Sequence, residues 1–292
     1  MSGIYVEILI AGPLDAVWER TQDPRLHQQW DLRFSTIRYL PREREDEPRR
    51  FHYSTRIGFG LTIDGAGEST GTRQAEDGGA TSALKFWSGS ALSLIREGSG
   101  YWRYIPVDGG VRFLTWYDYE VRWPLLDLVF RPLIHWATAW SFDRLRLWIE
   151  RGTEPGLAFR LAAAYAAARL GVGFVWLYHG LVPKVWLAHR TEAVLLQAAG
   201  APAALMPWIG AAEALFGLAV LFTPRRRWPL WLTVLAMPAA LAAVALSAPW
   251  VLGEAFNPVT LNLATLLLAV TALLLQPYVP SAARCITRKG KA

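Results

Sequence analysis

Four long apolar runs in the second half of the chain constrain its fold more than any other feature. They are Leu157–Val182, Ala203–Phe222, Trp228–Leu246 and Pro258–Gln276. Each is close to the ~20 residues with which an α-helix crosses a hydrocarbon core of roughly 30 Å. Because lipid offers backbone groups no hydrogen-bond partners, such runs must be helical. The sequence therefore predicts four transmembrane helices, and tryptophans stand near their ends, where indole rings prefer the interface: Trp186, Trp208, Trp228, Trp231 and Trp250.

Charge is divided unevenly between the two halves. The net charge is −2 through Pro155 and +8 beyond it, against +6 for the whole chain. The basic residues of the second half bracket the apolar runs, at Arg225–Arg227 and in a basic tail at 281–292. By the positive-inside rule this predicts a multi-pass protein of a bacterial-type inner membrane with both termini cytoplasmic. It argues against nucleic acid as a partner, since no basic face falls on the soluble half.

The single cysteine, Cys285, lies in the basic tail. One cysteine excludes a disulfide within the chain, as a cytoplasmic soluble region would lead one to expect. We expect the tail to leave this thiol open to a maleimide reagent.

The first half has the pattern of an antiparallel sheet. A strand over 4–10 is followed by two short helices and then by alternating segments with tight-turn signals between them, at Asp77-Gly78-Gly79 and Asp108-Gly109-Gly110. The one long helix left in this half is expected over Pro132–Glu150. Its broad aromatic side would cover the sheet: Leu133, Trp136, Ala137, Trp140, Leu147 and Trp148. We expect a domain over 1–152, a linker over 153–156, a membrane domain over 157–280 and the tail.

Aromatic residues gather on one face of the predicted sheet. If a single helix does not fill the concave side, these residues line an apolar cavity, in which tyrosine hydroxyls would orient a ligand. A purely structural core is the alternative that the pattern leaves open. The candidate ligand-binding residues are Phe51, Tyr53, Phe86, Phe113, Tyr117 and Tyr119.

The order of strand, two short helices, long antiparallel run and late helix resembles the START-like, or SRPBCC, superfamily, which includes polyketide cyclase-like and coenzyme Q-binding members. The stretch from Pro13-Leu-Asp-Ala-Val-Trp18 through Asp23-Pro24 to Trp30-Asp31 is similar to the opening of that superfamily. The resemblance implies an α+β helix-grip fold, a curved antiparallel sheet that grips the late helix around an apolar ligand cavity.

The membrane half resembles the DoxX-like family of four-helix proteins. The resemblance is carried by the run Arg169-Leu-Gly-Val-Gly-Phe-Val-Trp-Leu-Tyr-His-Gly-Leu-Val-Pro-Lys184, by Glu213, and by Phe256-Asn-Pro-Val-Thr-Leu-Asn262. It implies an all-α transmembrane four-helix bundle. The family is named after a subunit linked to quinone-coupled oxidation, but no residue here identifies that activity.

Polar residues interrupt the apolar runs or border them. A charge near the centre of a bilayer costs about 2.5–3.5 kcal/mol on insertion scales, so such groups usually face the bundle interior. We expect Arg169 and Glu213, near mid-depth on neighbouring antiparallel spans, to form an ion pair. The intramembrane polar candidates are Arg169, His179, Lys184, Glu213, Asn257 and Asn262.

These observations predict membrane-tethered binding of a hydrophobic small molecule, of lipid or quinone type. An enzyme or a subunit of a quinone-linked redox complex is one alternative, and a structural membrane subunit is another. A membrane protein partner or a second copy of the chain stays open. The sequence shows no paired catalytic acid and base, no metal-ligand spacing and no cofactor fingerprint, so we name no catalytic residue, metal or cofactor.

Overall fold

The computed structural model describes residues 3–42, 44, 47–74 and 78–288. The chain forms two compact units, one from residues 1–159 together with 280–292, and the other from residues 160–279.

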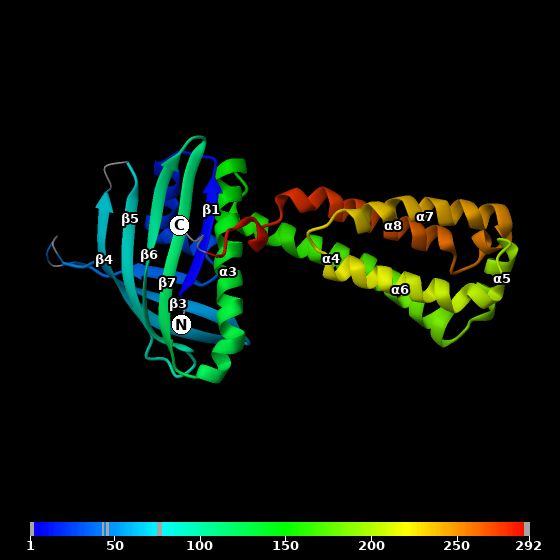
Figure 1. Cartoon of the computed structure of the whole chain (residues 1–292), viewed down its shortest axis with the longest axis horizontal. Coiled ribbons are helices and arrows are strands. Elements are labelled where there is room, and N and C mark those ends of the chain that lie inside the picture. The colour runs from blue at the N-terminus through cyan, green and yellow to red at the C-terminus, as the bar shows by residue number, and fades with distance from the viewer. Residues whose placement is uncertain (1–2, 43, 45–46, 75–77, 289–292) are drawn as a thin grey trace. The chain divides into compact units, whose positions relative to one another are not determined.

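The N-terminal unit is an antiparallel sheet with helices against it (Figure 1). The seven strands that the described residues form follow the order β1-β7-β6-β5-β4-β3-β2, so the first and last strands are neighbours. A long helix, α3, follows the last strand, which gives the predicted helix-grip architecture. The elements in chain order are β1 (Ile4–Ile10), α1 (Leu14–Gln22), α2 (Pro24–Trp30), β2 (Thr36–Tyr39), β3 (Arg50–Gly58), β4 (Leu61–Gln74), β5 (Ala80–Trp87), β6 (Ile95–Val107), β7 (Gly110–Val121) and α3 (Pro124–Arg151).

Glycines inside β4 and β6 make these strands longer than the pattern predicts. A Cβ atom at Gly65 would lie 2.3 Å from the ring of Tyr53, and one at Gly98 would lie 2.4 Å from the ring of Phe86. The bare backbone thus lets an aromatic ring of the adjacent strand lie flat across the sheet. The sequence pattern predicts separate strands near Phe59–Gly65 and Glu68–Gln74 and near Leu92–Glu97 and Tyr101–Pro106. That division is wrong, because β4 and β6 each run through the gap.

The C-terminal half of α3 packs against the sheet. Ala139, Phe142 and Leu145 are buried in one core with residues of β1, β6 and β7. Phe142 stacks on Phe113 of β7 with ring centroids 4.5 Å apart. The helix begins at Pro124 rather than at the predicted Pro132, because proline is well suited to a first helical turn.

The prediction that Trp136 lies on the sheet-facing side of α3 is wrong, because this side chain is 49% exposed. Leu133 is 57% exposed, but it also lines the cavity described below. Buried residues further along the helix pack on the sheet, among them Thr138, whose hydroxyl lies 2.9 Å from that of Tyr117 on β7.

The end of the chain returns to the N-terminal unit. Ile286 pairs with Glu7 of β1 through two backbone hydrogen bonds of 2.9 and 2.8 Å. The thiol of Cys285 donates to the carbonyl of Ala139 at 3.2 Å, and burial raises the pKa of this thiol to about 12. The expectation of an open, reactive thiol is therefore wrong.

A buried carboxylate holds this returning segment. The side chain of Asp143 on α3 is fully buried. It accepts hydrogen bonds from the Ser281 amide, the Arg284 guanidinium and the Arg146 guanidinium, each at 2.7 Å.

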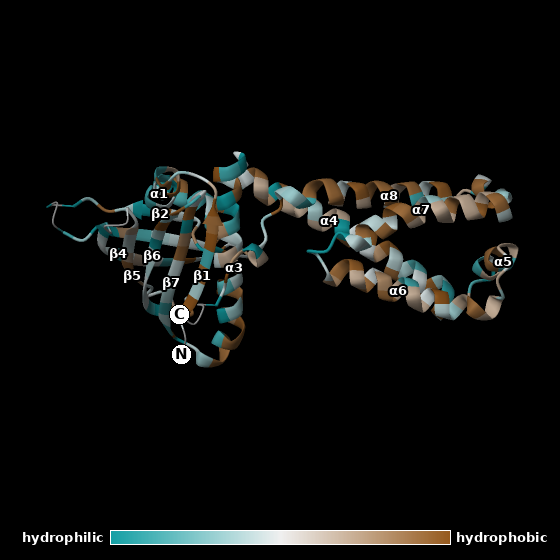
Figure 2. Cartoon of the chain, turned by 45° about the horizontal axis from the view of Figure 1, so that its top comes forward, coloured by the Kyte–Doolittle hydropathy of each residue, from teal (hydrophilic) through white to brown (hydrophobic). Residues whose placement is uncertain are grey.

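The second unit contains most of the apolar helices (Figure 2). Four segments among the described residues are long and apolar enough to cross a membrane, namely Pro155–Trp186, Ala203–Phe222, Trp228–Ser247 and Pro258–Tyr278. The predicted spans match them within a few residues. Their helices are α4 (Pro155–His179) with the π-helical turn η1 (Gly180–Trp186), α6 (Met206–Phe222), α7 (Trp228–Ser247) and α8 (Pro258–Leu275). A short helix that the sequence analysis did not predict, α5 (Arg190–Ala198), lies between the first and second segments.

Glycines let the first two spans approach so closely that their backbones are in contact. A Cβ atom at Gly180 would lie 2.4 Å from the Gly210 carbonyl oxygen, and one at Gly217 would lie 2.6 Å from the Leu177 amide nitrogen. Small residues at these positions thus allow the close helix contact that is typical of membrane bundles.

Candidate functional site

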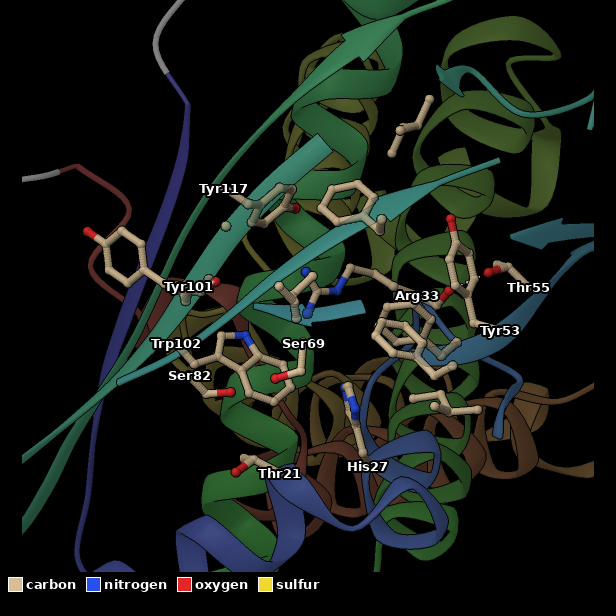
Figure 3. Close-up of a pocket in the computed structure, with 18 of the residues that line it drawn as sticks. Thr21, His27, Arg33, Tyr53, Thr55, Ser69, Ser82, Tyr101, Trp102 and Tyr117 are labelled. Atoms are coloured by element: carbon tan, nitrogen blue, oxygen red, sulfur yellow. Dashed lines mark hydrogen bonds between the residues drawn. The ribbon is translucent and has the colours of Figure 1, made fainter. Parts of the chain in front are cut away.

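The N-terminal unit encloses a cavity of about 870 Å³. The sheet and the helices α1, α2 and α3 all contribute to its wall, which is largely apolar and aromatic (Figure 3). A single helix therefore does not fill the concave side of the sheet. Sheet residues that line the cavity include Phe51, Tyr53, Ile63, Ser69, Ser82, Leu84, Phe86, Trp102 and Tyr117.

Four of the six candidate ligand-binding residues line this cavity: Phe51, Tyr53, Phe86 and Tyr117. The remaining two lie elsewhere. The ring of Phe113 is buried against Phe142, and the Tyr119 hydroxyl donates to the carboxylate of Asp127 at 2.8 Å. A ligand-binding role for the four lining residues stays a prediction.

The polar side of the cavity is built on Asp31, which directly follows α2. Its side chain is fully buried. Arg33 donates to it from Nε at 2.9 Å and from Nη2 at 2.6 Å, and a His27 ring nitrogen lies 3.0 Å from its second oxygen. The spacing explains the geometry, since His27 and Asp31 are four residues apart and lie on the same side of the last turn of α2.

Charges in this cluster are set by burial and by one another. Burial alone would raise the pKa of Asp31, but the Arg33 guanidinium and the hydrogen bonds from His27 and Arg33 outweigh it and hold this pKa well below its usual range. Burial lowers the pKa of His27, against the opposing effect of Asp31. At neutral pH the cluster thus holds an ionised carboxylate, a guanidinium and a neutral imidazole.

Arg33 presents this charge to the interior of the cavity (Figure 3). Its guanidinium carbon lies 5.4 Å from the ring centroid of Tyr117 and 5.6 Å from that of Phe34, distances at which a cation is attracted to a ring face. Asp31 takes two of the five N–H donors that a guanidinium carries. The cavity can therefore accommodate a mainly apolar molecule and offers hydrogen-bond donors to one polar end of it.

Our sequence reasoning missed His27, Asp31 and Arg33 as a cluster. The His-x-x-x-Asp spacing before Arg33 was the available signal. Among the described residues, none of the His, Cys, Asp and Glu side chains form a group of three that could hold a metal ion.

In the membrane half, Arg169 does not pair with Glu213, so that prediction is wrong. Arg169 is buried and donates to the carbonyl oxygens of Val220 at 2.7 Å, Thr223 at 2.6 Å and Arg226 at 3.3 Å. These carbonyls lie at and just beyond the C-terminal end of α6, where helical partners are missing and a cation is favoured. Arg169 therefore caps the second span.

Glu213 pairs with Lys184 of η1 instead, at 2.7 Å, and Lys184 also lies 3.5 Å from Glu192 of α5. The backbone carbonyl of His179 accepts from the Lys184 ammonium at 3.5 Å. A π-helical turn in this position changes which residues face the second span, and the sequence pattern does not show it.

The two asparagines lie at the start of α8. The Asn257 side chain caps the helix by accepting from the Thr260 amide at 3.1 Å. Asn262 is half-buried one turn further on.

Comparison with known proteins finds matches to both halves of the chain. The DoxX-like family matches residues 173–270. The membrane protein YndG of Bacillus subtilis, itself uncharacterized, is 47% identical over 183 residues, which are 61% of this chain and 68% of that protein.

Solved structures are similar to the N-terminal half. A STAR-related lipid transfer protein of Xanthomonas axonopodis is 17% identical and aligns over 50% of this chain and 84% of its own, with a TM-score of 0.39. The Zhui aromatase/cyclase of a Streptomyces species is 12% identical and aligns over 52% of this chain and 98% of its own, with a TM-score of 0.38.

The order of strands and helices, together with the four apolar helices, defines a membrane protein in which an antiparallel sheet with a long helix, in the helix-grip arrangement, precedes a helical region that the DoxX-like family matches over residues 173–270. The chain belongs to the same family as the Bacillus subtilis membrane protein YndG.

Proposed function

We propose that this protein binds an apolar small molecule of the lipid or isoprenoid quinone class in the cavity of its N-terminal unit. The cavity carries the proposal: its volume of about 870 Å³ lies within the ~300–1,000 Å³ usual for ligand pockets, and its wall is rich in aromatic rings. Tethering supports it further, because the four spans keep the cavity beside the phase in which such a molecule dissolves.

Arg33 indicates that the ligand has a polar end. Its guanidinium, on a side chain that is 14% exposed, favours a molecule whose polar end accepts hydrogen bonds, through a carbonyl or an anionic oxygen. The aromatic wall takes the apolar remainder. A ligand of this kind has one polar end and a chain or ring system without charge.

Mass spectrometry of molecules that co-purify with the full chain tests the proposal. Leu84 lines the cavity from β5, and the next residue, Lys85, is exposed. We expect Leu84→Trp to reduce the amount of bound apolar molecule, while Lys85→Trp, the same change on the other face of the same strand, leaves it unchanged. Equal amounts in both variants, or no apolar molecule in the wild type, would refute the proposal.

We also propose a bacterial-type inner membrane with both termini cytoplasmic, on the placement of the basic residues. Since Cys285 is packed, the test needs new cysteines in a Cys285→Ser background. A membrane-impermeant maleimide should label Thr191→Cys, between the first two spans, in intact cells. Arg103→Cys, on the sheet, should react only after the membrane is opened, and the opposite result would reverse the orientation.

A further inference from the structure

The N-terminal half of α3 turns apolar side chains outward. Five of them recur at spacings of three and four residues and thus form one stripe along the helix. We call this the outer stripe, which consists of Leu125 (83% exposed), Leu128 (78%), Val129 (72%), Leu133 (57%) and Trp136 (49%).

The polar groups of the same helix segment face the domain. Asp127 is buried and accepts from the Tyr119 hydroxyl at 2.8 Å and from Arg131 Nε at 2.9 Å. A ring nitrogen of His135 lies 3.1 Å from the backbone oxygen of Tyr5. Phe130 and Ile134 of the same segment also pack on the core. The segment is thus apolar on both sides, whereas a helix on the surface of a water-soluble domain has its apolar side on the core and a polar side outward. The outer stripe is therefore suited to an apolar surrounding.

A second apolar element is the tip of the β3–β4 hairpin. Ile57, Phe59 and Leu61 are exposed there, and the Phe59 ring has no neighbour that shields it, at an exposed fraction of 105%. Phe59 has a φ of 52° between Gly58 and Gly60. A left-handed conformation is rare for a bulky residue, so the tip holds an aromatic ring outward at some conformational cost.

The outer stripe and the hairpin tip both reach the opening of the cavity. Ile57 and Leu133 line the cavity and are also about half exposed, at 47% and 57%, so they lie where it meets the surroundings. One belongs to the hairpin tip and the other to the outer stripe. At these two positions the opening is bordered by apolar groups that water solvates poorly, whereas the exposed Arg42, Glu47 and Arg49 line the cavity elsewhere.

We infer that the outer stripe and the hairpin tip dock on the lipid bilayer and open the cavity to its hydrocarbon phase. The helix α3 is tethered close to the bilayer, because only three residues separate its end at Arg151 from the start of the first span at Pro155. The five side chains of the stripe and the three of the tip include no charge, which suits insertion below the headgroups. Trp136, at the end of the stripe, is a residue type that prefers the membrane interface.

Docking on the bilayer can be tested separately from ligand binding, because docking needs no ligand in the cavity. Single cysteines replace Leu128 in the stripe or Phe59 at the tip, in a full-length Cys285→Ser chain. Arg103, exposed on the sheet, is the matched control position. Each cysteine carries an environment-sensitive fluorophore, and the protein is placed in lipid nanodiscs with or without doxyl groups on the acyl chains.

We expect the label at position 128 or 59 to emit at shorter wavelength than the label at 103, and to be quenched by doxyl lipid while the control is not. Two independent positions keep the test decisive if one variant does not fold. Emission like that of the control at both positions would overturn the inference. A shift to shorter wavelength without quenching would overturn it as well, because protein, in the form of a partner or a second copy, would then cover the surface.

Discussion

At the scale of single residues, Asp31 is the group on which the polar side of the cavity depends. It is fully buried and holds Arg33 by two hydrogen bonds. Asp31→Asn would leave the guanidinium in the cavity without its countercharge. Breaking such a pair from one side typically costs about 3–5 kcal/mol. We expect a loss of this size at pH 7, measured by hydrogen exchange of the sheet in full-length protein, which reports the N-terminal unit separately from the spans.

The exposed Asp64 provides the control. Asp64→Asn should change the stability by less than about 0.5 kcal/mol, as is usual for surface positions. If the two variants lose the same small amount, the Asp31–Arg33 pair does not stabilise the unit.

His27 makes the stability of the N-terminal unit depend on pH. Its pKa is lowered in the folded protein, so the unfolded chain binds a proton first as the pH falls. The stabilising contribution is complete above the ordinary histidine pKa of about 6.5 and decreases as the pH falls toward the folded value. We expect His27→Gln to lose less stability than the wild type between pH 7 and pH 5.5. Parallel pH profiles would mean that His27 does not titrate on unfolding in this range.

Double-mutant cycles can show which basic residue of the bundle interacts with Glu213. Lys184 and Glu213 are in contact, so Lys184→Met and Glu213→Gln should couple by about 0.5–3 kcal/mol in detergent unfolding. Arg169 contacts carbonyl groups at the end of α6 instead. Arg169→Met and Glu213→Gln should therefore add within about 0.5 kcal/mol. Coupling of Arg169 rather than Lys184 to Glu213 would contradict the observed pairing.

At the scale of elements, the returning C-terminal segment acts as a strap on the N-terminal unit. Truncation after Val279 removes the pairing of Ile286 with Glu7 and two of the three hydrogen bonds to buried Asp143. Hydrogen bonds to a charged group contribute about 1.5–3 kcal/mol each. We expect faster hydrogen exchange in β1 and α3 of the truncated chain, and a smaller effect of Arg284→Ala, which removes one bond. Unchanged exchange after truncation would show that the strap does not stabilise the unit.

The elements also show which structural features the sequence reveals. The spans could be predicted within a few residues because length and hydropathy determine them. The interruption of β4 and β6 was predicted wrongly, because a glycine that faces an aromatic ring across a strand pair has the same local signature as a glycine in a turn. Trp136 was wrongly placed on the sheet-facing side of α3, because a helical pattern of apolar residues does not show which of them the sheet covers.

The candidate site, like the fold, could be predicted only in part from the sequence. The alternation of aromatic residues indicated the sheet face, and Phe51, Tyr53, Phe86 and Tyr117 line the cavity. Phe113 has the same alternation but is covered by Phe142, a contact that depends on where α3 crosses the sheet. Arg33 lies in a connection between a helix and a strand, where no periodic pattern indicates the direction of a side chain.

At the scale of the whole molecule, one chain combines an apolar cavity with four helices long and apolar enough to cross a membrane, and under the proposed function this keeps the cavity near the bilayer. This arrangement suits a ligand that is dissolved in the bilayer rather than in water. The apolar border of the cavity, at Ile57 and Leu133, would let such a molecule enter without crossing water.

Photo-crosslinking in native membranes tests this account most directly. An apolar probe with an acyl chain and a diazirine near its end is added to membranes that contain the full chain, and the modified residues are mapped by mass spectrometry. We predict crosslinks at interior positions of the cavity such as Phe86 and Tyr117, which Leu84→Trp abolishes and Lys85→Trp does not. Crosslinks confined to the spans and the outer stripe, with none inside the cavity, would contradict the account.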